Sequence, residues 1–193
     1  MKITTSLILD SFSQVSFTEN EKKLIVEKFK TVYLKKGEIV IKPNCIVKHQ
    51  YYVYSGCLRA FHIDKSAKEH TMQFATKDWW ISDFTALFTS SKSIMTIEVL
   101  QDAVLFKVSK KDIEELYSKI PKLESLFRKK LEKAYASFQK RILANLSKTA
   151  QERYSSFVKN YPDFEKNIKN YHIASFLGIT SESLSRIRKT LKE

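Results

Sequence analysis

The spacing of apolar residues changes twice along this chain of 193 residues, and that change limits the fold more than any other feature. From about residue 32 to residue 108, short runs of β-branched and aromatic residues are separated by turn residues. Before and after this region, apolar residues recur every three or four positions. Successive side chains alternate between the faces of a strand, whereas a helix returns to the same face about every 3.6 residues. The sequence therefore predicts an α+β protein with helices before and after a central β-domain.

Short strand segments define the expected β-domain. They occupy residues 32–34, 39–41, 51–54, 57–63, 71–74, 94–100 and 104–108, and turn residues separate neighbouring segments. Regularly spaced short strands of this kind are typical of a β-sandwich or barrel of the jelly-roll type. We expect a double-stranded β-helix, or jelly roll, in a first domain that covers residues 1–120.

Capping signals mark where several helices begin. Thr18 and Glu21 have the spacing of a capping box, in which each side chain bonds the other residue's backbone N–H, and they predict a helix over residues 19–30. Ser109 is placed to cap the helix that follows the β-domain. Pro121 suits the first turn of the next helix because its fixed backbone angle is helical and its missing N–H is not needed there.

A narrow apolar stripe runs along the helix predicted for residues 121–146. It comprises six residues at steps of three or four: Leu123, Phe127, Leu131, Ala134, Phe138 and Ile142. The helix would be roughly 39 Å long at about 1.5 Å per residue, and so narrow a stripe on so long a helix is typical of a coiled-coil seam. We expect this dimerisation helix to pair with a second copy, which makes the protein a homodimer. The alternative is that the stripe packs on the β-domain of its own chain.

The last segment, residues 147–193, has the pattern of a helix-turn-helix domain. It opens with a second capping box at Thr149 and Glu152. The stretch IASFLGITSESLSRIRK, residues 173–189, then predicts two short helices joined at a glycine, because a left-handed backbone conformation is readily available only to that residue. The expected scaffold residues are small or apolar: Ala174, Gly178, Ile179, Leu184 and Ile187.

The residues left outward on the second of these helices are polar or basic. They are Ser181, Glu182, Ser185, Arg186, Arg188 and Lys189. Side chains of this kind on a recognition helix reach base edges and phosphates in the major groove of DNA. An ordinary helical hairpin can carry the same pattern, so a second observation is needed to distinguish the two.

Positive charge concentrates in the C-terminal half of the chain. Of 34 Lys and Arg and 21 Asp and Glu, residues 1–106 hold 14 and 11, which leaves 20 and 10 for residues 107–193 and gives balances of +3 and +10. A polyanion is the natural partner of such a charge distribution. Together with the helical hairpin and the expected dimer, it favours double-stranded DNA over the alternative of a solvated, lysine-rich surface.

The remaining residues argue against several other functions. No run approaches the roughly 20 apolar residues of a membrane span, and the N-terminus has no signal-peptide cleavage site, so we expect a cytoplasmic protein without a membrane partner. Cys45 and Cys57 are too few and too far apart for a metal site. No nucleophile elbow, phosphate-binding loop or pair of catalytic carboxylates occurs. We therefore expect neither an enzyme nor a bound metal or cofactor.

The order of β-domain, long helix and helix-turn-helix resembles the CRP/FNR family of bacterial transcription regulators over nearly the whole chain. The segments that carry the resemblance are VYLKKGEIVIKPN, YYVYSGCLRAF, IEVLQDAVLFKVSKKDIEELYSKIP, TAQERYSSFVKNYPDF and IASFLGITSESLSRIRK. The last two look most like those of short members from Bacteroidetes-type bacteria. The resemblance implies a cyclic-nucleotide-binding-like β-domain and a DNA-binding domain that acts on promoters, with RNA polymerase as a further partner. It also implies that Ser181, Glu182 and Arg186 contact bases.

The sequence departs from the family at the cassette that holds the cyclic phosphate. Where the family has Gly-Glu and then an Arg-Ser pair, this chain has Ser82-Asp83 and then Ser93-Ile94, which mark the candidate effector pocket. No arginine lies between residues 59 and 128 to grip a phosphate with two hydrogen bonds. Cyclic AMP binding is therefore not expected, and the identity of any small-molecule effector stays open. The alternative function is an effector-sensing or protein-interaction module whose helix-turn-helix is a relic.

Overall fold

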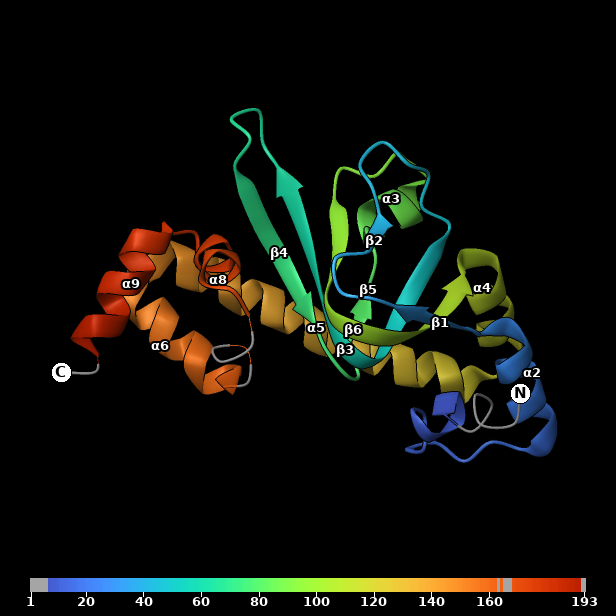
Figure 1. The fold of residues 1–193 in the computed structure, drawn as a ribbon. Helices are drawn as coiled ribbons and strands as arrows, with labels where there is room; N and C mark the ends of the chain where they lie inside the picture. Colours follow the sequence, from blue (N-terminus) through green and yellow to red (C-terminus); the bar gives the residue numbers. More distant parts are fainter. Residues whose placement is uncertain (1–6, 163, 165–167, 192–193) are drawn as a thin grey trace. The chain divides into compact units, whose positions relative to one another are not determined.

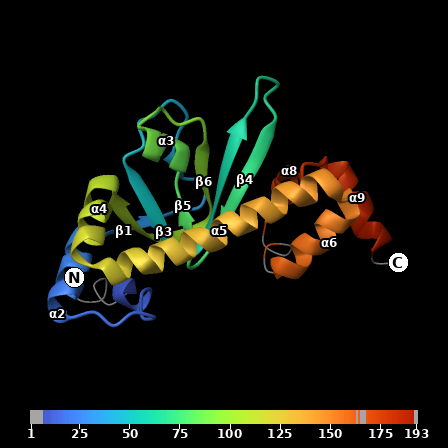
Figure 2. The same cartoon turned by 180° about the vertical axis from the view of Figure 1, so that it is seen from behind.

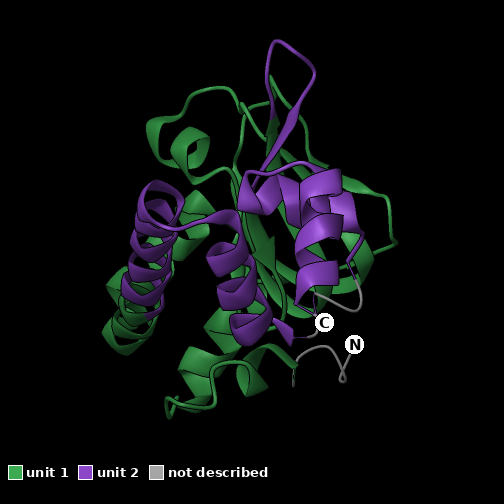
Figure 3. Ribbon diagram, turned by 90° about the vertical axis from the view of Figure 1, so that its left-hand side faces the viewer, with its two compact units in different colours: residues 1–62, 73–129 green, residues 63–72, 130–193 purple. Residues whose placement is uncertain are grey.

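The structure is a computed structural model that describes residues 7–162, 164 and 168–191 (Figures 1 and 2). The chain forms two compact units, each with its own internal packing. Unit 1 comprises residues 1–62 and 73–129, and unit 2 comprises residues 63–72 and 130–193 (Figure 3). This division differs from the three expected domains in two respects. The long helix is shared between the units, and the end of a β-hairpin belongs with the C-terminal helices.

The described residues form a sheet of six strands, most of which lies in unit 1. The strands are β1 (Lys30–Leu34), β2 (Ile39–Ile41), β3 (His49–Ile63), β4 (Glu69–Ala75), β5 (Trp80–Ile81) and β6 (Thr96–Ser109). The path through the sheet is β1-β6-β3-β4, with β2 also paired to β6 and β5 paired to β3. The pairs that β6 makes with β1, β2 and β3 are antiparallel. The two long strands thus pair with different partners along their length, as in the jelly-roll domain that the sequence predicts.

A bulge replaces the turn expected at Gly56. The segments on either side of this residue form one continuous strand, β3, and the register between β3 and β6 shifts repeatedly between Val53 and Leu58. Gly56 has φ of +91°, and a Cβ atom there would lie 2.5 Å from the carbonyl oxygen of Asp102. A bulge of this kind requires glycine because the backbone angle is left-handed and the neighbouring strand is too close for a side chain.

Two apolar clusters form the core of unit 1. The first is enclosed by the strands and contains Val53, Leu58, Ile81, Ile97, Val99 and Leu105 among its fully buried members. The second lies between the sheet and the helices and contains Phe12, Ile25, Tyr52, Phe106, Leu116 and Leu123 among its members. The N-terminal residues 7–15 contribute to this second cluster, a packing role that their short apolar run did not reveal in the sequence.

Besides the helical turn at residues 7–10, four helices in the described part of the chain contribute to unit 1. They are α2 (Glu19–Lys28), α3 (Phe84–Thr89), α4 (Lys110–Lys119) and the first turns of α5 (Pro121–Ser147). The capping box of α2 is confirmed, because the Thr18 N–H donates to the Glu21 carboxylate at 2.6 Å and the Glu21 N–H donates to the Thr18 hydroxyl at 3.3 Å. Ser109 caps α4 as expected, since its hydroxyl accepts from the Asp112 N–H at 3.0 Å. The short helix α3 was not predicted.

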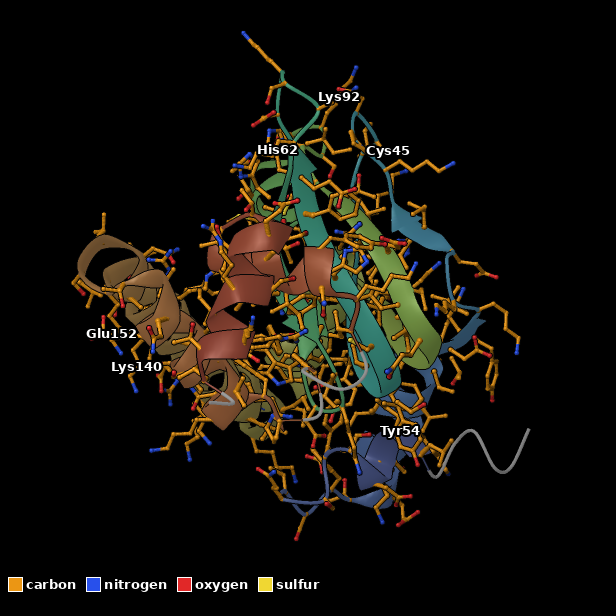
Figure 4. All side chains as sticks on the ribbon, turned by 60° about the vertical axis from the view of Figure 1, so that its left-hand side comes forward. Cys45, Tyr54, His62, Lys92, Lys140 and Glu152 are labelled. Atoms are coloured by element: carbon orange, nitrogen blue, oxygen red, sulfur yellow. The ribbon has the colours of Figure 1, made fainter. Side chains whose placement is uncertain are left out.

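Unit 2 contains the rest of α5 together with α6 (Ala150–Asn160), α8 (Asn170–Leu177) and α9 (Ser181–Thr190). The second capping box is also confirmed: Thr149 and Glu152 each bond the other's backbone N–H. Glu152 lies in the first turn of α6 (Figure 4). Among the described residues, no helix is both long enough and apolar enough to span a membrane.

Candidate nucleic-acid interface

Helices α8 and α9 are joined by a turn of three residues, 178–180, that begins with the predicted glycine. Gly178 adopts the left-handed conformation, with φ of +68°, and the N–H of Ile179 donates to the carbonyl of Ala174 at 3.0 Å. This is the bonding pattern of a Schellman cap, which satisfies carbonyls that the helix end leaves free. Thr180 then starts α9, because its hydroxyl accepts from the Ser183 N–H at 3.2 Å. The local signals in the sequence therefore produce the turn that they predict.

Four of the five scaffold residues of this helical pair are wholly or partly removed from solvent, whereas Gly178 is exposed in the turn. Ala174 and Leu184 are buried, while Ile179 and Ile187 are half-buried beside them. Further buried residues of the same unit complete the core: Tyr154, Phe157, Ile173 and Leu177. Small and apolar residues between the helices let their backbones approach, so the orientation of α9 follows from that of α8.

The outward face of α9 is open to solvent. Glu182, Ser185, Arg186 and Lys189 are exposed, and Ser181 is half-buried at the start of the helix. Hydrogen bonds from its own N–H and from the Thr180 hydroxyl lower the pKa of Glu182, and the charge of Arg186 acts in the same direction. At neutral pH this face therefore presents a carboxylate acceptor and two cations, a donor and acceptor set that suits DNA bases and phosphates.

Arg188 does not belong to this outward face. Its Nε donates to the Tyr154 hydroxyl at 3.0 Å and its Nη1 donates to the Asn170 side-chain oxygen at 2.5 Å. The guanidinium therefore braces α9 against α6 and α8, and the expectation that Arg188 is free to bind a phosphate has to be corrected. The sequence could not reveal this, because Arg188 and Lys189 are adjacent and only packing decides which of them points inward.

Arg153 is a second bracing residue, and the sequence reading did not identify it. Its Nε donates to the carbonyl of Leu177 at 3.2 Å, and its Nη1 donates to the carbonyl of Lys148 at 2.7 Å. Both carbonyls lie at or just beyond the C-terminal end of a helix, where backbone acceptors lack intrahelical partners. Arg153 thus joins the ends of α5 and α8 to α6. No spacing rule in the sequence distinguishes it from the exposed basic residues nearby.

The apolar stripe of α5 is divided between two environments. Leu123 and Phe127 lie in the core of unit 1, with exposed fractions of 0% and 9%, so they are removed from the expected dimer surface because their own chain covers them. Leu131 and Ile142 are 61% and 55% exposed, while Ala134 and Phe138 are half-buried. Three further residues of α5 are exposed and apolar: Tyr135, Leu143 and Leu146.

In the candidate effector pocket, hydrogen bonds join Asp83 to Ser93 and Ile94, while Ser82 bonds a backbone carbonyl elsewhere. Asp83 is 0% exposed, and its carboxylate accepts from the Ala86 N–H at 3.0 Å, the Ser93 hydroxyl at 2.8 Å and the Ile94 N–H at 3.1 Å. The Ser82 hydroxyl donates to the carbonyl of His49 at 2.9 Å. Three donors that could hold an anionic ligand are thus already directed to a carboxylate of the chain itself.

The two cysteines are free thiols in different surroundings. Cys45 is exposed in the loop between β2 and β3 (Figure 4), whereas Cys57 is buried in β3. Burial raises the pKa of the Cys57 thiol to about 12, which keeps it protonated and unreactive. Among the described residues, no group of three or more His, Cys, Asp and Glu side chains is arranged to hold a metal ion.

Comparisons with known proteins give the same architecture. The family model for the cyclic nucleotide-binding domain matches residues 31–119. The chain is 23% identical to the anaerobic regulatory protein of Haemophilus influenzae over 90% of this chain and 72% of that protein. It is equally identical to the fumarate and nitrate reduction regulatory protein of Vibrio cholerae, over 90% and 74%. A solved CRP/FNR-family regulator from Eubacterium rectale has a TM-score of 0.71 at 20% identity, over 91% and 84% of the two chains.

The family model covers the β-domain. The similarity to the relatives extends over nearly the whole chain and therefore reaches the helices of unit 2. The helical pair α8 and α9 has the turn, the packed core and the open polar face that DNA-binding helices of this kind require. The β-domain therefore matches the cyclic nucleotide-binding domain, and over most of its length the chain is similar to transcription regulators of the CRP/FNR type.

Proposed function

We propose that this chain is a transcription regulator of the CRP/FNR type that binds double-stranded promoter DNA as a homodimer, with α9 as its recognition helix, and that it does so without cyclic AMP. In the cytoplasm, RNA polymerase at the same promoters is the partner through which binding would change transcription. The observation that carries the proposal is the open face of α9, where Glu182, Arg186 and Lys189 stand exposed on a helix whose opposite side is buried.

The dimer part of the proposal rests on α5. Leu131, Tyr135, Ile142 and Leu146 follow one another at steps of four, seven and four residues and are exposed, which places them on one side of the helix. A contiguous row of large apolar side chains on one helix is costly to leave in water and is typical of a helix–helix interface. The occupant that fits best is the same row on a second copy, because two such stripes pack into a symmetric coiled coil.

The cyclic AMP part of the proposal rests on Asp83. Its buried carboxylate already accepts the hydroxyl of Ser93 and the backbone N–H of Ile94. A phosphate at the same place would meet a negative charge, and no arginine lies between residues 59 and 128 to offset it. Any effector of this domain should therefore be something other than a cyclic nucleotide, and its identity is open.

A selection experiment tests the proposal directly. Wild-type protein is used to select binding sites from random double-stranded DNA, and the enriched sites are then titrated at several salt concentrations. We expect an inverted repeat whose half-sites are about one helical turn, or 34 Å, apart, and an affinity that falls steeply with salt. Enrichment of no sequence, with only weak and uniform binding, would instead support an effector-sensing or protein-interaction module.

A further inference from the structure

A single hydroxyl group joins helix α8 to the end of the β3–β4 hairpin within unit 2. The Ser175 hydroxyl donates to the carbonyl of Glu69 at 2.7 Å, and it accepts from the Thr71 N–H at 2.9 Å and from the Thr71 hydroxyl at 3.1 Å. A serine hydroxyl has one hydrogen to donate and two lone pairs to accept with. Ser175 therefore uses its whole hydrogen-bonding capacity on two residues of β4.

The same part of β4 is held from α5 by a half-buried cation. Arg141 donates from Nη1 to the carbonyl of Thr71 at 3.3 Å. Its guanidinium lies 4.7 Å from the ring centre of Phe176 and 5.5 Å from that of Phe138, and burial lowers the pKa of Arg141. Thr71, itself 4% exposed, thus has its N–H bonded by α8 and its C=O bonded by α5.

These bonds occupy the free edge of the sheet. Strand β4 is the last strand in the order β1-β6-β3-β4, so its outer main-chain groups face away from β3. Residues two apart in a strand direct their main-chain groups to the same side, which accounts for Glu69 and Thr71 acting together. An exposed strand edge normally attracts another strand. Here Ser175 and Arg141 take the place of that strand, and this arrangement of four residues is called the clasp below.

We propose that Ser175 is a positioning residue for DNA binding: through the clasp, it sets the orientation of α8, and hence of the recognition helix α9, on the hairpin. This inference rests on the proposed function. Because α8 and α9 are in contact and each has a buried leucine, Leu177 and Leu184, fixing α8 also fixes α9. The exposed residues Glu182, Arg186 and Lys189 take no part in the clasp, so a closed clasp leaves the DNA-binding face open. A pre-oriented helix loses less conformational entropy when it binds, which strengthens binding.

The test compares Ser175→Ala with Ser155→Ala, a matched control at an exposed position of α6. The probe is the DNA site that wild-type protein selects. We expect Ser175→Ala to bind it about tenfold more weakly, the factor that corresponds to one lost hydrogen bond of typical strength, with unchanged sequence preference and an unchanged salt slope. Ser155→Ala should bind as wild type does. Hydrogen exchange on the free proteins should show faster exchange at the Thr71 amide in Ser175→Ala only.

A double-mutant cycle with Thr71→Val separates positioning from a general loss of stability. If the two residues act through one clasp, the double variant should bind DNA about as weakly as Ser175→Ala alone. The proposal would be overturned if Ser175→Ala bound DNA as tightly as wild type, or more tightly, although its Thr71 amide exchanged faster. A shallower salt slope would also overturn it, since that marks a lost phosphate contact. Failure of the wild type itself to bind DNA would instead refute the proposed function, whereas the exchange experiment would still report on the clasp.

Discussion

Arg188 donates from Nε to the hydroxyl of Tyr154 at 3.0 Å, and this bond turns the guanidinium of the last basic pair on α9 into the protein. Its neighbour Lys189 is exposed. The two residues carry the same charge and are adjacent in sequence, yet only one of them is free to meet DNA.

Substitution of these two residues should therefore have different effects. Arg188→Ala should lower the free energy of unfolding by about 1–3 kcal/mol, because hydrogen bonds from a charged donor are lost and their partners are left behind. Lys189→Ala should leave stability unchanged but reduce the salt dependence of DNA binding by about one unit. Thermal unfolding and salt titrations of both variants check this. Equal stability of Arg188→Ala and wild type would contradict the bracing role.

Arg186 should determine sequence preference. It is exposed one turn beyond Glu182 on α9, where an arginine can bond guanine with two hydrogen bonds worth about 1–3 kcal/mol in discrimination. Arg186→Ala should relax the preferred sequence at one position of each half-site, whereas Lys189→Ala should weaken binding to all sequences alike. Selection from random DNA with each variant measures this. If Arg186→Ala selects the same sites as wild type with equal stringency, α9 does not read bases through this residue.

The exposed part of α5 should hold the dimer together. Leu131→Asp places a charge in the proposed interface and should give monomers with little affinity for the selected site. The matched control is Ala136→Asp, at another exposed position of α5 that lies off the stripe. Light scattering should show a monomer for Leu131→Asp and a dimer for Ala136→Asp. A dimeric Leu131→Asp protein would exclude this face of α5 as the interface.

Two glycines with left-handed backbones should respond differently to the same substitution. At Gly37 nothing lies within 4 Å of an added Cβ atom, so Gly37→Ala should cost only about 1 kcal/mol of conformational strain. At Gly56 the added atom would lie 2.5 Å from the Asp102 carbonyl oxygen. Gly56→Ala should therefore be several times more destabilising, since backbone has to move. Urea unfolding of both variants measures the difference, and similar midpoints would show that the bulge relaxes freely.

Cyclic nucleotides should not bind the β-domain tightly. The carboxylate of Asp83 accepts the Ser93 hydroxyl and two backbone N–H groups, and it would repel a phosphate in the same place. Calorimetry with cyclic AMP and cyclic GMP should detect no binding at micromolar concentrations. Affinity of micromolar or better for either nucleotide would show that the domain binds it in another way or that Asp83 moves aside.

Several elements of this structure could be predicted because the responsible interactions are local. The capping boxes at Thr18 and Thr149 involve residues three apart, and both form. The cap at Gly178 likewise depends on a few consecutive residues. The jelly-roll class follows from the period of the strand segments, which is set by backbone geometry. In each case the energies that decide the structure act within one turn or one strand, so the sequence carries the signal directly.

Other features depend on which surfaces meet, and a repeating pattern does not record that. Leu123 and Leu131 are both leucines of the same apolar stripe on α5, but Leu123 is buried in its own unit and Leu131 is exposed. Ser55-Gly56 indicated a turn, and the strand continues through it because β6 lies alongside. The bond between Ser175 and Thr71 joins residues 104 positions apart. Such contacts form only after the chain has folded, when packing decides which side chain of several similar ones turns inward.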